Sequence, residues 1–252
     1  MHNVLIMAGG RSSRMRNSTN LHTHKALVTV FDIPLIELNL LYAFVYRFSR
    51  VWISVAAAEE ELIAHINGLR AAYKRKLGVH IQVIIEPEPL GTIGAAQFVH
   101  IGEEDLLVLN VDNLLDLDLS AFLRSHVRAR AAMSIASHHE LFRIPFGQLL
   151  VKEDRVVDYL EKPEQKILVS SGTYVLGTGA RSLISQKYGR ERVDIPRLGK
   201  DLIAQGLKVH SFFHSAVWSD INDKDTLQRT REMERWPLME EISKLKKELI
   251  NR

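Results

Sequence analysis

The stretch VLIMAGG, residues 4–10, is a continuous apolar run that ends at a pair of glycines. Such a run is typical of a strand buried on both faces of a sheet, and the glycines end it in a turn. Further strand-like runs alternate with amphipathic helical patterns. The strand-like runs are Arg50–Ala56, His80–Ile85, Leu106–Val111 and Ala132–Ala136, and the helical ones are Leu35–Phe48, Glu59–Tyr73, Thr92–His100 and Leu119–Arg130. This alternation predicts an α/β fold with a mostly parallel sheet.

The pattern changes after about residue 140. Gln148–Val151 and Arg155–Leu160 are spaced as the two strands of a hairpin. The remaining expected elements are strands at Gly172–Leu176 and Lys208–Phe213 and helices near Ile195–Gln205 and from Asp223 to about Arg235. No linker and no internal repeat interrupts them, so we expect a single domain over residues 1–252.

A C-terminal helix is expected over about residues 237–250, after Pro237. Its apolar residues are Leu238, Ile242, Leu245 and Leu249, which share one face at helical spacing. Two interpretations follow: the stripe packs on its own domain, or it contacts a second copy of the chain in a homodimer.

The composition is that of an ordinary globular protein, with 46% hydrophobic and 25% charged residues. The absence of cysteine excludes disulfides, cysteine-ligated zinc, iron–sulfur clusters and thiol nucleophiles. Lys and Arg total 33 against 30 acidic residues, a net charge of +3 without long runs of like charge, so we expect no nucleic-acid partner. No apolar run approaches the ~18–20 residues of a membrane span and no signal peptide is recognisable, so we expect no membrane contact and a cytoplasmic location.

The loop after the first strand, Ala8–Arg16, has the composition of a phosphate cradle. Gly9 and Gly10 allow backbone N–H groups to approach a phosphate closely, while two serines and three arginines add donors and positive charge. The loop matches neither G-x-x-x-x-G-K-[ST] nor G-x-G-x-x-G, which argues against a P-loop NTPase and against a dinucleotide-binding domain. The alternative is a glycine turn with solvated arginines.

Lys25 lies in the segment HTHKALVTVFDIPLIE, residues 22–37. If the chain returns here to the carboxyl end of the first strand, the ammonium group can stabilise charge on a transferring phosphoryl group. A solvated surface lysine is the alternative.

The segments MAGGRSSRMRN (residues 7–17) and HKALVTVFDIPLIE (24–37) together resemble the N-terminal signature of the sugar nucleotidyltransferases, the NDP-sugar pyrophosphorylases. Later segments match in order, so the resemblance covers most of the chain. It implies a Rossmann-like, doubly wound α/β/α sandwich. It also implies a reaction in which an NTP and a sugar 1-phosphate give an NDP-sugar and pyrophosphate with Mg²⁺.

The chain departs from the family signature at three places in this region. Arg11-Ser12-Ser13 stands where Gly-x-Gly is commoner, His24 replaces a proline, and Asp32 replaces a glycine. The loop also resembles that of the molybdopterin guanylyltransferases. These departures concern the identity of the substrates.

The resemblance implies roles for residues on the nucleotide side. Arg14 and Lys25 become the catalytic positive charges on the triphosphate and the α-phosphate. The segment EPEPLGTIGAA, residues 86–96, resembles a base-contacting segment of mannose- and heptose-1-phosphate guanylyltransferases, which favours GTP. The nucleotide-binding residues implied in this way are Ala8, Gly9, Gly10, Arg11, Ser12, Ser13, Glu86, Leu90, Gly91 and Thr92.

Two aspartates are the expected magnesium ligands. Asp112 ends the buried run LLVLNVD, and ligands bind outside the carboxyl ends of strands in open α/β sheets. Asp220 lies in VWSDIND, which resembles the late W-x-D-I-G segment of the family. Carboxylate oxygens suit this hard ion. The alternative for each aspartate is the capping of a turn or a helix.

The resemblance places the sugar phosphate on a third set of residues. The segments are Phe146-Gly147, YLEKP (159–163) and SSGTY (170–174). The residues implied are Asn110, Gly147, Glu161, Lys162 and Ser170, the last standing where asparagine is usual.

The sequence therefore predicts an Mg²⁺-dependent sugar-1-phosphate nucleotidyltransferase whose partners are an NTP and a sugar 1-phosphate. Two alternatives remain: a cofactor-directed nucleotidyltransferase resembling molybdopterin guanylyltransferase, and a non-catalytic subunit that binds a sugar nucleotide.

Overall fold

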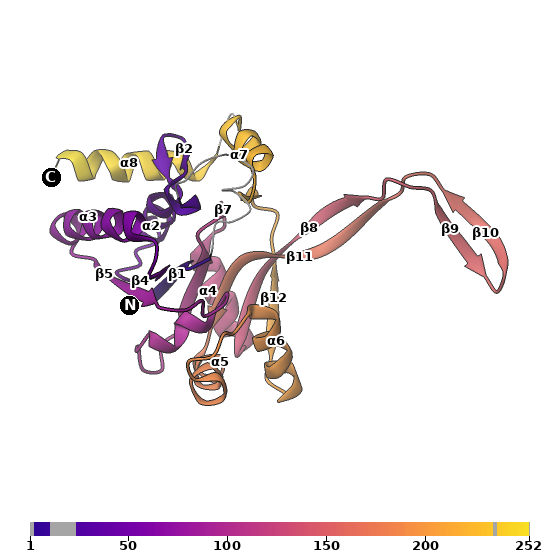
Figure 1. Ribbon diagram of the computed structural model, residues 1–252, viewed down its shortest axis with the longest axis horizontal. Coiled ribbons are helices and arrows are strands. Elements are labelled where there is room, and N and C mark those ends of the chain that lie inside the picture. The colour runs from indigo at the N-terminus through magenta and orange to yellow at the C-terminus, as the bar shows by residue number, and fades with distance from the viewer. Residues whose placement is uncertain (1–2, 11–23, 234–235, 252) are drawn as a thin grey trace.

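A seven-stranded sheet forms the centre of the molecule (Figure 1). The computed structural model describes residues 3–10, 24–233 and 236–251. The strand order is β12-β8-β11-β6-β1-β4-β5, and β11 alone runs antiparallel to its neighbours. The bounds are β1 Asn3–Ala8, β4 Arg50–Ala56, β5 His80–Glu86, β6 Leu106–Asn110, β8 Met133–Arg143, β11 Glu164–Leu176 and β12 Val209–Phe213. This mostly parallel mixed sheet confirms the predicted fold class.

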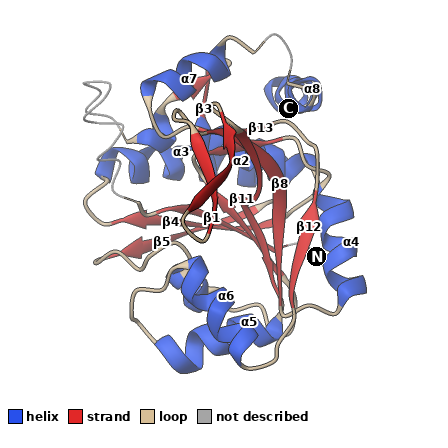
Figure 2. Cartoon of the chain, turned by 90° about the vertical axis from the view of Figure 1, so that its right-hand side faces the viewer, coloured by secondary structure: helices blue, strands red, loops and turns tan. Residues whose placement is uncertain are grey.

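Helices cover both faces of the sheet, as Figure 2 shows. One hydrophobic core joins the first face to α2 (Leu35–Val45), α3 (Glu60–Leu77), α4 (Leu119–Ala129), α7 (Lys224–Arg231) and α8 (Leu238–Asn251). A second core joins the other face to η2 (Gly94–Phe98), α5 (Thr178–Leu183), η3 (Ile184–Tyr188) and α6 (Ile195–Ala204). The strands are apolar on both sides because each face is buried under one of these layers.

Local signals in the sequence set several helix ends. The Asp118 side chain accepts the backbone N–H of Ala121 at 3.0 Å and caps α4. Asp223 and Thr226 form a capping box at the start of α7. Helix α3 ends at Gly78, which adopts the left-handed conformation at φ +67°.

The predicted helix over residues 92–100 is wrong in type, since the structure has only the short 3₁₀ helix η2 there. The backbone at its start is hydrogen-bonded to another segment. The N–H of Ile93 donates to the Val193 carbonyl at 3.1 Å, and the N–H of Val193 donates to the Leu90 carbonyl at 2.8 Å. These long-range bonds replace the first turn of an α-helix.

The C-terminal helix α8 packs on the chain's own core. Leu238, Ile242 and Leu249 are buried in the first core, and Leu245 packs partly buried against it. The apolar stripe is therefore covered from within the chain. None of the helices in the described ranges is long and apolar enough to cross a membrane.

The order of the strands creates a crevice beside β1. The chain passes from β1 to β4 and β5 on one side, and β6 then lies on the other side of β1. Such a reversal of strand order is where ligands bind in open α/β sheets, at the carboxyl ends of the strands.

A long ribbon leaves the body at the carboxyl end of β8 (Figure 1). Strands β8 and β11 continue pairing outward as far as Arg143 and Glu164. The hairpin of β9 (Gln148–Lys152) and β10 (Arg155–Leu160) extends this ribbon. We call residues 141–168 the arm. The sequence predicted the hairpin but not its projection from the body.

Candidate active site

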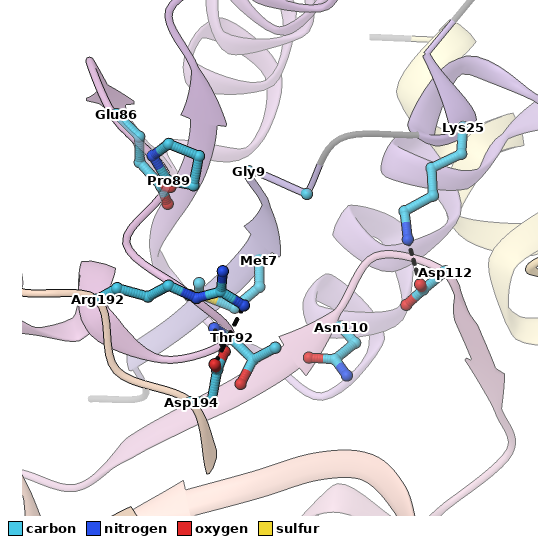
Figure 3. A pocket seen from close by; sticks show the side chains of 12 residues that line it. Met7, Gly9, Lys25, Glu86, Pro89, Thr92, Asn110, Asp112, Arg192 and Asp194 are labelled. Atoms are coloured by element: carbon cyan, nitrogen blue, oxygen red, sulfur yellow. Dashed lines mark hydrogen bonds and ion pairs between the residues drawn. The ribbon is translucent and has the colours of Figure 1, made fainter. Parts of the chain in front are cut away.

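A pocket of about 530 Å³ lies at the carboxyl ends of β1, β5 and β6 (Figure 3). Segments far apart in the sequence meet there because the strand order reverses at β1. The lining residues are Met7, Gly9, Gly10, Lys25, Glu86, Pro89, Gly91, Thr92, Asn110, Asp112, Arg192 and Asp194.

Lys25 begins a 3₁₀ turn, η1 (Lys25–Leu27), that His24 fixes in place. The Nδ1 atom of His24 accepts the N–H of Ala26 at 3.1 Å, so the ring proton is on Nε2 and is donated to the Gly10 carbonyl at 3.2 Å. His24 is 1% exposed. The imidazole therefore ties the turn to the loop after β1, a role that a proline at this position could not perform.

The Lys25 ammonium group forms an ion pair with the Asp112 carboxylate, as Figure 3 shows. Both side chains are mostly buried, at 17% and 15% exposure. A charge pair in such a site is only weakly screened by solvent. The pair places a cation and an anion side by side in the wall of the pocket.

Asp220 is brought to the back of Asp112 by two short strands that the sequence did not predict. β7 (Asn113–Leu115) pairs antiparallel with β13 (Trp218–Asp220), and the N–H of Ile221 donates to the Asp112 carbonyl at 2.9 Å. Burial raises the pKa of the Tyr174 hydroxyl, and the nearby charges of Asp112 and Asp220 add to this rise.

Glu86 forms the opposite wall of the pocket. Its carboxylate is 2% exposed and accepts the N–H of Leu90 at 3.0 Å and the hydroxyl of Ser54. A Cβ atom on Gly9 would lie 2.6 Å from the Glu86 carboxylate, so a larger residue at position 9 would force this buried carboxylate to move.

The third wall comes from a segment that sequence reasoning missed. Asp194 accepts the N–H of Thr92 at 2.9 Å, and the Thr92 hydroxyl accepts the N–H of Ile195 at 2.9 Å. Arg192 pairs with Asp194 at 3.2 Å and reaches over the pocket (Figure 3). Only the helical start at Ile195 was visible in the sequence, since a loop that packs on a distant loop has no periodic pattern.

A comparison with protein-family models matches residues 3–233 to the family described as nucleotidyl transferase. The match spans every element that builds the pocket. This chain belongs to the nucleotidyl transferase family.

Relatives of this nucleotidyl transferase family member differ in their named nucleotides. A D-glycero-α-D-manno-heptose 1-phosphate guanylyltransferase from Aneurinibacillus thermoaerophilus is 22% identical over 90% of this chain and 96% of its own length. A glucose-1-phosphate adenylyltransferase from Shewanella oneidensis is 24% identical over 88% of this chain. The chain spans only 61% of the length of that second relative.

A solved structure has the same fold. The crystal structure of HddC from Yersinia pseudotuberculosis superposes with a TM-score of 0.68, at 21% identity, over 93% of this chain and all of that one. The likeness shows that the two chains share their fold over nearly the whole length of this one.

Five of the ten residues expected to bind the nucleotide line the pocket of this nucleotidyl transferase: Gly9, Gly10, Glu86, Gly91 and Thr92. Ala8 and Leu90 are buried directly next to its walls. Arg11, Ser12, Ser13 and Arg14 lie outside the described residues.

The residues expected to bind the sugar phosphate are divided between two places. Asn110 lines the pocket, and Ser170 lies nearby, where its hydroxyl is 3.1 Å from the Tyr174 hydroxyl. Gly147, Glu161 and Lys162 lie on the arm and do not line the pocket. The structure therefore does not bring these three together with Lys25.

Proposed function

We propose that the protein transfers a nucleotidyl group from an NTP to a sugar 1-phosphate, giving an NDP-sugar and pyrophosphate with Mg²⁺ as cofactor. The observation that carries the proposal is the meeting of Lys25, Asp112 and the loop after β1 at one end of a nucleotide-sized pocket. The names of the two relatives, both sugar-phosphate nucleotidyltransferases, support this substrate class. A cytoplasmic location is part of the proposal.

The reaction is one in-line displacement. An oxygen of the sugar phosphate attacks the α-phosphorus of the NTP, a new P–O bond forms, and the bond to the leaving pyrophosphate breaks. No nucleophile from the protein is required. Lys25 stabilises the charge on the α-phosphate as it passes through the transition state, and Arg14 is assigned to the triphosphate by the resemblance.

The two aspartates fit a magnesium ion. Among the described residues no group of three or more His, Cys, Asp or Glu side chains could hold a metal ion. A pair of carboxylates suits Mg²⁺, which keeps several waters and takes the rest of its ligands from substrate phosphates. When bound, the ion supplies positive charge to the phosphates. Asp112 and Asp220 would hold it, and Asn222, which donates to Asp220 at 2.5 Å, orients the second carboxylate.

We expect Asp112→Asn and Asp220→Asn each to raise the Mg²⁺ concentration for half-maximal activity by about tenfold or more, because each removes one anionic ligand. The measurement is a magnesium titration of pyrophosphate release at saturating substrates. Asp116→Asn is the control, since β7 (Asn113–Leu115) separates this aspartate from Asp112. An unchanged magnesium requirement would remove the residue from the metal site.

GTP is the proposed nucleotide, and Glu86 is its proposed selector. Guanine presents two adjacent N–H donors, N1–H and N2–H₂, and an ionised carboxylate accepts from both. Uracil, thymine and cytosine lack this pair. The buried carboxylate of Glu86 lines the pocket at the end of β5. It accepts two hydrogen bonds within the protein, and its remaining lone pairs can accept further ones.

Glu86→Gln should therefore lower kcat/KM for GTP relative to UTP by about 10- to 100-fold, the usual value of a bidentate base contact. Glu88→Gln is the matched control, because Glu88 is exposed two residues further on. The measurement is turnover with each NTP in competition. An unaltered GTP to UTP ratio would place base selection elsewhere.

The test of the activity itself is pyrophosphate release with Mg²⁺ from each NTP combined with a panel of sugar 1-phosphates. Release that needs one NTP and one sugar phosphate together is the expected result and identifies both substrates. Binding of an NTP without release for any acceptor would favour the non-catalytic alternative. The absence of NTP binding would overturn the proposal.

A further inference from the structure

Helix α2 carries an amide side chain into the apolar core beside the pocket. Asn39 is 3% exposed, and its neighbours Leu38 and Leu40 are 1% and 0% exposed. A polar group that is buried among apolar side chains costs free energy unless its hydrogen bonds are made. The bonds of Asn39 therefore indicate what it does at this position.

The Asn39 amide group donates to two backbone carbonyls. Its Nδ2 atom lies 2.9 Å from the Leu35 carbonyl, one turn earlier in α2, and 3.1 Å from the Val111 carbonyl, 72 residues further along the chain. Both partners are acceptors, so the NH₂ group and not the amide oxygen must face them. One side chain thus joins the start of α2 to the end of β6.

The Val111 carbonyl belongs to the peptide group that leads into Asp112. Val111 is one residue past the last register pair of β6 with β1, and its N–H donates to the Met7 carbonyl at 3.2 Å. Its carbonyl and the Asp112 nitrogen share one planar group, so the direction of that carbonyl sets the backbone at Asp112. The Asp112 carbonyl in turn accepts the N–H of Ile221 at 2.9 Å. Asn39 and Ile221 therefore hold the peptide groups on the two sides of Asp112.

The Leu35 end of this link leads to Lys25 through two backbone bonds. The N–H of Leu35 donates to the Val28 carbonyl at 3.0 Å, and the N–H of Val28 donates to the Lys25 carbonyl at 3.1 Å. Val28 is the residue that ends the turn η1. The turn that carries Lys25 is thus bonded to the same residue of α2 that accepts from Asn39.

The two connections end at the ion pair of the pocket. The side chains of Lys25 and Asp112 point toward one another from different segments, as Figure 3 shows. A misplacement of ~1 Å can lower a rate by ~10²-fold. Residues that orient a metal-ligating side chain typically contribute ~10–100-fold to metal affinity or activity. A link between these two segments has the position needed for such an effect.

We propose that Asn39 is a positioning residue for the transfer reaction. Its buried amide fixes the Val111–Asp112 peptide to the start of α2, and thereby sets the Asp112 carboxylate against the Lys25 ammonium group. Asn39 itself does not line the pocket, so it acts through these two residues and not on the substrate. The inference rests on the proposed function.

The first test replaces Asn39 by leucine, which has the same branched arrangement of side-chain atoms but cannot donate. We expect Asn39→Leu to lower kcat for pyrophosphate release by about 10- to 100-fold. The affinity for the NTP, measured by calorimetry, should change by less than about threefold, because the residues that line the pocket are retained. Leucine suits an apolar core, so a folded Asn39→Leu enzyme with wild-type kcat would overturn the inference.

Tyr42→Phe is the matched control on the same helix. Tyr42 is 4% exposed, and its hydroxyl donates at 2.7 Å to the Leu117 carbonyl, in the same connection between β6 and α4. The variant also loses a buried bond to a backbone carbonyl, but β7 separates this carbonyl from Asp112. Its kcat should stay within about twofold of the wild type, since the reacting groups keep their places. An equal loss of kcat in the two variants would overturn the role of Asn39.

Amide hydrogen exchange, followed by NMR, tests the link without any activity. In Asn39→Leu the N–H groups of Val28 and Val111 should exchange about tenfold faster or more, because the two segments open more readily once they are separated. In Tyr42→Phe both should exchange as in the wild type. Unchanged exchange in Asn39→Leu would overturn the link.

Asn39→Asp keeps the inference testable if the leucine variant does not fold. A protonated carboxyl group has one O–H and can donate to one of the two carbonyls, whereas the ionised form donates nothing. Burial raises the pKa of such a carboxyl group, so the kcat of this variant relative to wild type should fall as the pH rises from about 6 to 9. Circular dichroism confirms that the variant stays folded over this range.

A ratio of kcat values that is independent of pH would overturn the inference. An inactive wild type would instead overturn the proposed function, and the exchange measurement would still decide whether Asn39 joins the two segments.

Discussion

Replacing Lys25 by alanine is expected to lower turnover by about 10³-fold or more while leaving the fold intact. Removal of one well-placed charge or donor from a transition state typically costs ~10²–10³ in rate, and removal of the cation that faces a transferring phosphoryl group costs ~10³–10⁵. Lys25 meets the conditions for a large effect, because its side chain is 17% exposed and lines the pocket. Water entering the space left by the side chain would solvate the phosphate but could not supply the charge.

Whether kcat or the affinity for the NTP falls in Lys25→Ala distinguishes a catalytic role of this lysine from a binding role. We expect kcat to fall while the affinity for the NTP, measured by calorimetry, changes by less than about tenfold, since the charge matters most in the transition state. Lys25→Arg serves as the partner variant: it keeps the charge but spreads it over a planar fork, so it should recover only part of the rate. A Lys25→Ala enzyme with wild-type kcat would remove this residue from the reaction.

The sequence predicts the part of the site that lies at the ends of β1 and β6, because that part follows from the order of the strands. Apolar runs that end at Gly9 and at Asp112 identify two buried strands, and parallel strands present their carboxyl ends at the same edge. The structure has these strands side by side as β1 and β6, with Met7 aligned to Asn110. Knowing that both strands were parallel and buried was enough to predict that their ends would meet.

Contacts between loops were beyond the reach of the sequence. The bond from His24 to the Gly10 carbonyl and the bonds from Thr92 to Asp194 join segments that have no periodicity of their own. In the sequence, His24 is a departure from the family's proline. In the structure it is a buried residue that forms hydrogen bonds. His138 is also buried, and it bonds to Ser171 at 2.8 Å. In each case burial depends on tertiary contacts that single residue types do not reveal.

The arm shows a different limit. The hairpin over residues 148–160 could be predicted from its two apolar runs and the polar turn between them. Its direction could not, because direction depends on how far β8 and β11 continue to pair beyond the sheet. The family resemblance implied that Glu161 and Lys162 bind the sugar phosphate, because their motif follows the others in the expected order along the chain. Their distance from the pocket depends instead on the path of the β8–β11 ribbon.

A second large effect is expected at Gly91, where alanine should destabilise the protein by about 2–5 kcal/mol. Gly91 has φ +84°, and an L-residue at positive φ costs roughly 1–2 kcal/mol. A Cβ atom there would also lie 2.8 Å from the carbonyl carbon of Val193 and 2.9 Å from the Asp194 carboxylate. Relief of this overlap requires the two loops to separate, and forced overpacking typically costs ~1–3 kcal/mol.

The expected separation also damages the nucleotide pocket, because the bonds that Thr92 and Ile93 make to Asp194 and Val193 are those that hold the third wall in place. Gly91→Ala should therefore weaken NTP binding as well as lower the free energy of unfolding measured in urea. Gly78→Ala provides the control, since Gly78 has φ +67° in the left-handed region and no atom lies within 4 Å of its Cβ position. That variant should lose only about 1 kcal/mol and keep its NTP affinity, because it bears the backbone cost alone. Equal losses in the two variants would mean that the loops yield without strain and that the close approach of Gly91 to Val193 does not hold the wall.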